Sequence, residues 1–340
     1  MTVTKKVTIR DVARHAGVSV ATVSHVVNDT HYVTPELHSR VYTAISTLNY
    51  QPNRLARALS QKAIPLLALV VPDIGNPYWS AVARAVQDIT DPHNYSVIVC
   101  SSDGQPEREA RFLRSISGWV SGLILHPYHL TSEHVNRLSS QGVPVVVLGD
   151  FAATEMQPPH WDQVTSNNLG GARMAVEHLI GLGHRRIAFI EGQADTPSSL
   201  KRLAGYRASM EEASLPVDER WIVPGDYTQA GGRRAMAALL ELPERPTAVF
   251  CANDLSALGA LNVAQMRGMH VPADLSIVGF DDIDEAALAS PPLTTISQRP
   301  QLVGTVIAET LIERLHGRTE PARRAVHGTL VVRESAAAPR

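Results

Sequence analysis

Hydrophobic and polar positions follow two different patterns along this chain. Before about residue 51, apolar residues recur at helical spacing in three short segments that begin near Thr8, Ser19 and Thr34. From residue 63 onward, short apolar runs alternate with amphipathic helical segments, which is typical of a parallel sheet flanked by helices. The sequence therefore predicts an α/β protein with a small helical head and a larger α/β body.

The predicted elements of the body fall into two similar groups. The first group has strands at 66–71, 96–100, 122–125 and 143–148, with helices at 78–89, 107–117 and 132–141. The second has strands at 186–190, 221–223, 248–251 and 276–279, with helices at 169–182, 200–213, 230–240 and 255–267. Segments 294–298 and 325–332 flank a last helix at 302–315 and are suited to cross between the groups. Two tandem α/β lobes are expected.

The head has strong helix start and turn signals. Gly17 suits a sharp turn between the first two helices, and Ser19 has the chemistry of an N-cap for the second. Thr34, as a cap, and Pro35, at the first helical position, begin the third helix. Two short helices at a fixed angle can place one of them in a DNA major groove. The alternative is a small three-helix domain without a DNA partner.

A short segment with helical spacing follows Pro52. Alone it is too short to form a stable helix in water, but it can become ordered on DNA. Arg54 and Arg57 would then contact phosphates, and Leu55 or Leu59 is free to act as an apolar wedge between base steps. The alternative interpretation is an ordinary linker.

Composition and charge distribution narrow the range of possible functions. The 340 residues are 44% hydrophobic and 19% charged, as expected for a globular protein of two or three units. The formal net charge of −2 hides a division, because residues 1–62 carry eight Lys or Arg and only three Asp or Glu. A basic head on an acidic body suits phosphate contact by the head alone.

Cysteine content and the N-terminal residues indicate the compartment. Cys100 and Cys251 each lie in an apolar run, which predicts reduced core thiols and no disulfide framework. The first residues form no apolar signal region, and no stretch approaches the ~20 apolar residues of a membrane span. A soluble, cytoplasmic protein is expected.

Polar and aromatic residues follow the predicted strands of both lobes, where open α/β sheets bind their ligands. These candidates are Asn76, Tyr78, Trp79, Arg202, Asn253, Asp281 and Gln298. Aromatic faces suit the C–H face of a sugar ring or a flat base, and arginine is a rigid fork of five donors. Each residue alone could also be a helix cap or a surface polar group, but together they mark strand ends in both lobes.

Catalytic motifs are not found. No G-x-G-x-x-G follows a strand, and there is no G-x-S-x-G, Walker or H-E-x-x-H sequence. His126, His129 and His134 are joined by no cysteine or clear carboxylate set, so no metal site is predicted. Adjacent Asp281 and Asp282 point in different directions, which favours a single acceptor over an acid–base pair. No enzyme activity or cofactor is expected.

Three motifs stand in a characteristic order. They are Thr-Ile-x-Asp-Val-Ala from Thr8, Gly-Val-Ser-x-x-Thr-Val-Ser-x-Val-x-Asn from Gly17, and Tyr-x-Pro-Asn-x-x-Ala-Arg-x-Leu from Tyr50. With them, the chain resembles the LacI/GalR family of bacterial transcription regulators over essentially its whole length. The resemblance implies a homodimer, a near-palindromic operator, and a periplasmic-binding-protein-like body whose lobes close over a ligand.

The resemblance also implies residue roles and domain boundaries. DNA contacts are expected from Thr8, Ser19, Val20, Ala21, Thr22, Ser24, His25, Asn28, Asn53, Arg54, Ala56, Arg57 and Leu59. Val20 and Ala21 would be the main base-reading pair, and Leu59 would insert into the minor groove. The expected domains are a helix-turn-helix domain at 1–51, a hinge helix at 52–62 and an effector domain at 63–340. Lobe 1 would comprise about 63–164 and 298–322, and lobe 2 about 165–297 and 323–340.

The resemblance indicates the chemical type of the effector less directly than it indicates the site residues. The resemblance places the family's effector positions on Tyr78, Trp79, Arg202, Asn253, Asp281 and Gln298 and, more loosely, on Asn76 and Tyr227. Pentose-responsive members resemble this set, whereas purine-responsive members resemble segments 221–227 and 246–251. Thr196 replaces an arginine of the purine type, and 127–129 replace an acidic residue of sugar-binding relatives. A repressor of a sugar-catabolic operon with a sugar-like effector is predicted. A purine-type regulator is the alternative.

Two other classes compete with a regulator. A sugar-binding protein of a transporter is disfavoured by the basic head and by the lack of a signal region. A cytoplasmic α/β enzyme is disfavoured because the catalytic motifs are missing.

Overall fold

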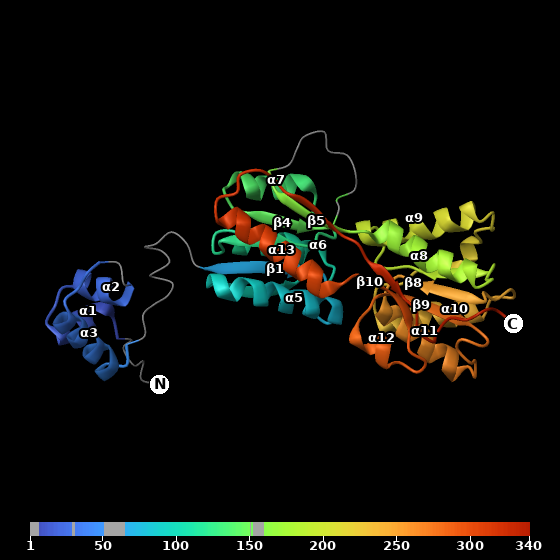
Figure 1. The fold of residues 1–340 in the computed structure, drawn as a ribbon, viewed down its shortest axis with the longest axis horizontal. Coiled ribbons are helices and arrows are strands. Elements are labelled where there is room, and N and C mark those ends of the chain that lie inside the picture. The colour runs from blue at the N-terminus through green and yellow to red at the C-terminus, as the bar shows by residue number, and fades with distance from the viewer. Residues whose placement is uncertain (1–6, 29–30, 51–64, 150, 152–159) are drawn as a thin grey trace. The chain divides into compact units, whose positions relative to one another are not determined.

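The computed structural model describes residues 7–28, 31–50, 65–149, 151 and 160–340. The chain divides between Ile64 and Pro65 into two units, the head and the body. Figure 1 shows the elements of each unit.

The head consists of the three predicted helices α1 (Ile9–Ala16), α2 (Val20–Asn28) and α3 (Pro35–Thr47). α1 begins where the Thr8 amide donates to the Asp11 carboxylate at 3.0 Å. α2 begins at Ser19, whose hydroxyl accepts the Thr22 amide at 3.0 Å. At α3, Thr34 is the N-cap residue but its side chain makes no cap hydrogen bond, so the start relies on Pro35. The helices enclose a small core of Val12, Ala13, Ala16, Val23, Val26, Val41 and Ala44.

The turn between α1 and α2 is fixed by α3. Gly17 has a φ of +63°, and its carbonyl and that of Ala16 accept hydrogen bonds from Arg40 at 3.2 and 2.7 Å. A Cβ at residue 17 would lie 2.7 Å from the Arg40 guanidinium. Glycine is therefore favoured by its backbone angle, and a larger residue would also displace the Arg40 guanidinium from this turn.

The first sheet of the body forms lobe 1. Its strands are β1 (Leu66–Val71), β2 (Ser96–Ser101), β3 (Gly122–Leu125), β4 (Val145–Leu148), β5 (Asp162–Ser166) and β11 (Arg323–Val326). They pair in parallel in the order β11-β5-β4-β3-β1-β2. α5 (Pro77–Thr90) and α13 (Pro300–Leu315) pack together on one face, while α6 (Pro106–Ile116) and α7 (Ser132–Ser140) contact the sheet from the other. Alternate residues of β1 enter different cores, because Leu67 and Leu69 face one side and Ala68 and Val70 the other.

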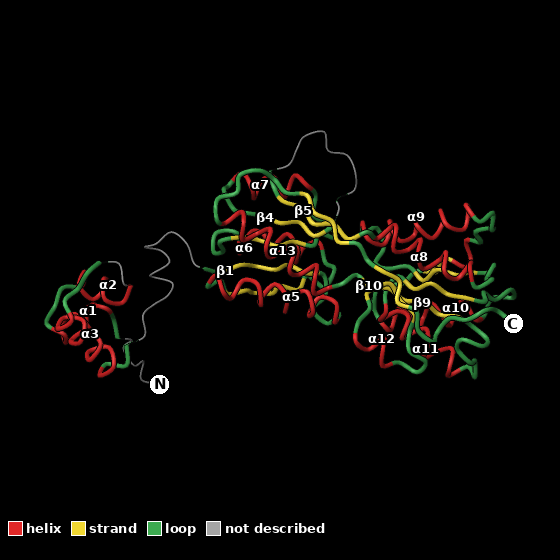
Figure 2. The backbone as a smooth tube through the Cα atoms, in the orientation of Figure 1, coloured by secondary structure: helices red, strands yellow, loops and turns green. Residues whose placement is uncertain are grey.

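The second sheet forms lobe 2. Its strands are β6 (Ile187–Ile190), β7 (Ile222–Val223), β8 (Ala248–Cys251), β9 (Ser276–Asp281), β10 (Thr294–Ser297) and β12 (Thr329–Val331). The order is β12-β10-β9-β8-β6-β7, and only the described β10–β12 pair is antiparallel. Its helices are α8 (Asn168–Gly181), α9 (Pro197–Glu212), α10 (Gln229–Leu240), α11 (Asp254–Met266) and α12 (Asp284–Leu288). Short 3-10 helices lie at Asp91–His93 in lobe 1 and Glu219–Trp221 in lobe 2. Figure 2 shows the strands of both sheets between their helices.

Four strands, β5, β7, β11 and β12, differ from the sequence prediction. Segment 325–332 is divided between β11 in the first sheet and β12 in the second, so this part of the chain does cross between lobes. The predicted boundary at 323 is wrong for β11, which lies in lobe 1. β5 was not predicted, since its sequence Asp-Gln-Val-Thr-Ser has little apolar character. Of the predicted strand 221–223, residue 221 belongs to a 3-10 helix.

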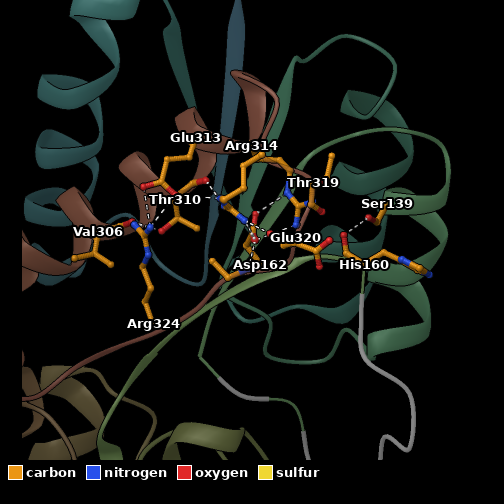
Figure 3. Close-up of polar contacts among 12 residues, drawn as sticks. Ser139, His160, Asp162, Val306, Thr310, Glu313, Arg314, Thr319, Glu320 and Arg324 are labelled. Atoms are coloured by element: carbon orange, nitrogen blue, oxygen red, sulfur yellow. Dashed lines mark hydrogen bonds and ion pairs between the residues drawn. The ribbon is translucent and has the colours of Figure 1, made fainter.

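A charged cluster at the base of lobe 1 joins β5, α13 and β11 (Figure 3). Asp162 is fully buried and accepts hydrogen bonds from Arg314 at 3.0 Å, Arg318 at 2.8 Å and the Ala322 amide at 2.6 Å. Glu313 extends the cluster by pairing with Arg318 and, from β11, with Arg324. These ion pairs and hydrogen bonds fasten β5 and β11 to α13. They stabilise a part of the sheet that has few apolar side chains to pack.

None of the described helices is long and apolar enough to span a membrane. Cys100 and Cys251 are both unpaired thiols, and burial raises the pKa of the Cys251 thiol.

Candidate effector site and DNA-binding face

The body contains a small cavity where the carboxyl ends of strands from both lobes meet. Its volume is about 30 Å³. The lining residues are Asn76, Tyr78, Trp79, His126, Tyr128, Leu148, Ser166, Asn168, Ser198, Arg202, Tyr227, Asp281 and Gln298. Every candidate named from the sequence lines it except Asn253. The structure therefore brings together residues that are far apart in the chain.

Arg202 and Asp281 form the charged centre of the cavity. Their side chains are only 6% and 5% exposed, and Nη2 of Arg202 lies 3.9 Å from Oδ1 of Asp281. Arg202 also donates from Nε to Asn168 at 2.9 Å and from Nη1 to the Ala252 carbonyl. Its guanidinium lies 3.8 Å from the centre of the Phe280 ring. The arginine is thus fixed before any ligand binds.

Asp281 is held by groups from both lobes. Nε2 of Gln298 donates to Oδ1 at 2.7 Å, and the Asn76 side chain donates a further hydrogen bond from the start of α5 in lobe 1. Burial raises the pKa of Asp281 to about 6, although Arg202, Gln298 and Asn76 each act to lower it. At neutral pH, Asp281 is therefore mostly ionised and can accept hydrogen bonds, and polar side chains from both lobes surround it.

Aromatic rings form the wall contributed by lobe 1. The ring of Trp79 lies 5.0 Å from that of Tyr78 and 4.6 Å from that of His126. Burial lowers the pKa of His126 to about 4, so its ring is neutral at pH 7 and donates from Nδ1 to the Leu148 carbonyl at 2.8 Å. The Tyr128 ring faces the Tyr227 ring of lobe 2 at 6.4 Å.

A buried carboxylate positions the loop that carries Tyr128. Glu109 of α6 accepts the backbone amides of Tyr128 at 3.0 Å and His129 at 2.9 Å. Burial raises the pKa of Glu109 despite these bonds. The sequence has no acidic residue directly after β3, and the carboxylate that contacts this loop comes instead from α6.

Asn253 holds the backbone of Tyr227 in place. Asn253 does not line the cavity as predicted, because its side chain caps α11 through the Ser256 amide at 3.0 Å and donates to the Tyr227 carbonyl at 2.9 Å. Tyr227 has a φ of +63°, and its ring lies so close to Gly192 that a Cβ there would be 2.0 Å from Cζ. Asn253 is therefore a supporting residue of the site.

Six lining residues were not predicted from the sequence. They are His126, Tyr128, Leu148, Ser166, Asn168 and Ser198. His126 and Tyr128 directly follow a predicted strand, so the strand-end rule would have found them.

The histidines that lie close together in the sequence, His126, His129 and His134, make separate contacts. His129 Nε2 lies 2.9 Å from the Gly104 carbonyl oxygen, and His134 Nδ1 lies 2.8 Å from the Thr131 hydroxyl. Among the described residues, no group of three or more potential metal ligands is found.

In the head, the outer face of α2 presents the predicted base-reading pair. Val20 is 43% exposed and Ala21 is also exposed, whereas Val23 and Val26 are buried. Near them, the hydroxyls of Ser19 and Thr22 are 2.8 Å apart. The exposed Thr8 and the half-buried Ser24 and His25 complete the described candidates. The side chain of Asn28 and the residues Asn53, Arg54, Ala56, Arg57 and Leu59 lie outside what the structure describes.

A three-helix head and a two-lobed body with a polar cavity define a class of ligand-binding, DNA-binding regulators. Residues 8–53 match the model of the bacterial regulatory proteins of the lacI family, and residues 176–336 match the periplasmic binding protein-like domain. The chain belongs to the LacI family of DNA-binding transcription regulators, and so the predicted family and fold class are confirmed. Regulators of this family bind DNA operators and small-molecule effectors, typically as dimers.

Full-length relatives support this membership. The chain is 38% identical over 315 residues to catabolite control protein A of Priestia megaterium, covering 92% of this chain and 94% of that protein. It is 32% identical over 330 residues to the HTH-type transcriptional repressor PurR of Aliivibrio salmonicida, covering 96% and 98%. The solved structure of the lac repressor dimer bound to operator and the anti-inducer ONPF superposes with a TM-score of 0.84 at 30% identity, covering 98% and 100%.

Proposed function

We propose that this protein represses a sugar-catabolic operon, binds a palindromic operator as a homodimer, and responds to a sugar or sugar derivative in the cavity between its lobes. One observation carries the ligand part of the proposal. The buried Arg202–Asp281 pair is joined by Asn76 from lobe 1, so a ligand at this point contacts both lobes.

The chemistry of the cavity suits a polyhydroxylated ring. Asp281 accepts hydrogen bonds from hydroxyl groups, while the Arg202 guanidinium and the Gln298 amide donate them. Trp79 and Tyr227 provide aromatic surface for the apolar C–H face of such a ring. Purines remain the alternative, since aromatic faces also suit a flat base. However, of the purine-like segment 221–227 only Tyr227 lines the cavity, whereas Trp221 is part of the hydrophobic core, and Thr196 stands where the purine type has an arginine.

A thermal-shift screen of sugars, sugar acids and purines tests the proposal, because a ligand that binds only the folded protein raises its melting temperature. A sugar that raises the melting temperature and changes operator affinity in a gel-shift assay is the expected result. A purine that does so in place of every sugar would establish the alternative.

Effector binding is predicted to weaken below about pH 6. The pKa of Asp281 is raised to about 6, so at pH 5 most of the carboxyl is protonated and one acceptor for ligand hydroxyls is lost. Calorimetric titration between pH 5 and 8 should give affinities that are constant above pH 7 and fall below pH 6. In Asp281→Asn, affinity should be weak and should lack this step. An unchanged step in that variant would assign the titration to another group.

Operator preference is predicted to depend on Val20 and Ala21. Neither side chain can form hydrogen bonds, and both are exposed on α2, so they can read only apolar features such as a thymine methyl. Val20→Gln or Ala21→Gln should change the half-site selected from a randomised operator library. Binding to non-specific DNA should stay nearly constant. An unchanged selected sequence in both variants would show that α2 docks in a different register.

A further inference from the structure

A second, larger cavity adjoins the effector cavity. It has a volume of about 340 Å³ and shares Asn76, Trp79, Tyr128 and Tyr227 with the inner one. We call it the outer chamber; its other lining residues are Pro72, Asp73, Asp103, Gly104, Gln193, Asp226 and Thr228. The inner cavity, at about 30 Å³, has room for only water in this arrangement of the lobes, so a ring can enter it only when the lobes move apart. The outer chamber is within the usual size range of small-molecule sites.

The charged groups that line the outer chamber are carboxylates. Asp73, Asp103 and Asp226 line it, and none of its described lining residues is Lys or Arg, although Asp103 pairs with Arg108 and Asp226 with Arg234 at 2.6 Å. Asp73 accepts the Gly75 amide at 2.8 Å, and Asp226 accepts the Thr228 amide at 2.9 Å, so both carboxylates are held in place. Burial acts to raise the pKa of Asp226, but bonds from Thr228 and Arg234 outweigh it and lower the pKa. Because carboxylate oxygens line the chamber and the two paired guanidinium groups do not, the lining suits hydroxyl donors better than a phosphate or carboxylate.

Both lobes contribute to the outer chamber. Tyr128 of lobe 1 and Tyr227 of lobe 2 line both cavities, and the centres of their rings are 6.4 Å apart. At the rim, a Cβ on Gly104 of lobe 1 would lie 3.6 Å from Oε1 of Gln193 of lobe 2. A group bound in the chamber would therefore contact both lobes and add to the free energy that holds them together.

We propose that the effector is a neutral molecule of two linked sugar rings, a disaccharide or glycoside. One ring occupies the inner cavity at Arg202 and Asp281, and the second lies in the outer chamber against the tyrosine rings and the carboxylates. Entry of the inner ring requires the Asn76–Asp281 hydrogen bond between the lobes to open. This inference rests on the proposed sugar-binding function and specifies the ligand.

The test is calorimetric titration of the full-length protein with matched sugars. The probes are glucose, galactose and xylose, disaccharides that contain them (cellobiose, maltose, lactose, melibiose and xylobiose), glucose 6-phosphate, and adenine as a purine. A disaccharide should bind at least tenfold more tightly than its component monosaccharides, and glucose 6-phosphate should bind no better than glucose. Gln193→Ala and Asp73→Asn should weaken the disaccharide several-fold and leave the monosaccharide unchanged. Asp195→Asn, an exposed position near Gln193 that does not line the chamber, is the matched control.

The outcomes separate this inference from the function on which it rests. A monosaccharide that binds as tightly as every disaccharide containing it, with both chamber variants unaffected, overturns the two-ring ligand but leaves sugar binding intact. Tighter binding of the phosphate contradicts the charge argument. Binding of adenine with no binding of any sugar overturns both proposals.

Discussion

Asp162→Ala is expected to lower the free energy of unfolding by about 3–5 kcal/mol, the usual cost of removing one partner from a buried ion pair. Asp162 is fully buried, while the side chains of Arg314 and Arg318 are 15% and 23% exposed. The substitution leaves both guanidinium groups and the Ala322 amide without their common acceptor. Since these groups belong to α13 and to the segments that follow it, the edge of the first sheet should loosen most.

Urea unfolding followed by circular dichroism measures this loss, and Glu133→Ala is the matched control. Glu133 pairs with Arg137 on the exposed face of α7 at 3.3 Å, with side chains 83% and 67% exposed. Such surface pairs contribute about 0–1 kcal/mol. Similar losses in the two variants would show that the Asp162 cluster adds nothing beyond a surface pair.

Because of the same cluster, the free energy of unfolding is expected to decrease at low pH. Burial acts to raise the pKa of Asp162, but hydrogen bonds from Arg318, Arg314 and the Ala322 amide outweigh it, so the pKa lies below its ordinary value of 3.8. A depressed carboxyl pKa contributes stability above the unfolded-state pKa and loses it as the pH falls through the folded-state pKa. The difference in stability between the parent and Asp162→Ala should therefore shrink below about pH 4.

Which strands the sequence could predict depended mainly on how apolar their residues are. β1 reads as a continuous apolar run because both of its faces are covered by helices. β11 lies at an edge and β5 lies next to it. The charge of Asp162 in β5 is compensated by arginines about 150 residues later in the chain, a pairing that no local pattern reveals.

The missed strand also explains part of the missed site. Ser166 ends β5 and Asn168 begins α8, so both lie at the end of a strand that the sequence pattern does not predict. Asn253 does not line the cavity for a different reason. It follows a correctly predicted strand, but the first turn of α11 uses its side chain as a cap, which points it away from the cavity. A strand-end position thus places a residue near the site without fixing the direction of its side chain.

Arg202→Ala is expected to weaken effector binding about ten- to a hundred-fold and so to remove the response of the repressor at ordinary effector concentrations. A hydrogen bond to a charged group contributes about 1.5–3 kcal/mol, and Arg202 is the cation nearest to Asp281 in the cavity. Operator binding without effector should persist, because Arg202 belongs to the body and the predicted DNA-reading helix α2 belongs to the head. Calorimetry for the effector and a gel shift for the operator measure the two properties separately.

Two further variants make this result specific to the cavity. Arg207→Ala removes an exposed arginine of the same helix that pairs with Glu219 at 2.6 Å, and effector affinity should be unchanged in it. Because Arg202 also binds Asn168 and the Ala252 carbonyl, its removal is expected to lower the melting temperature. Gln298→Ala therefore provides a milder probe, since it removes only one donor to Asp281 and should weaken the effector about three- to tenfold, as for loss of a hydrogen bond. If Arg202→Ala and Gln298→Ala both respond at the parental effector concentration, the effector binds elsewhere in the body.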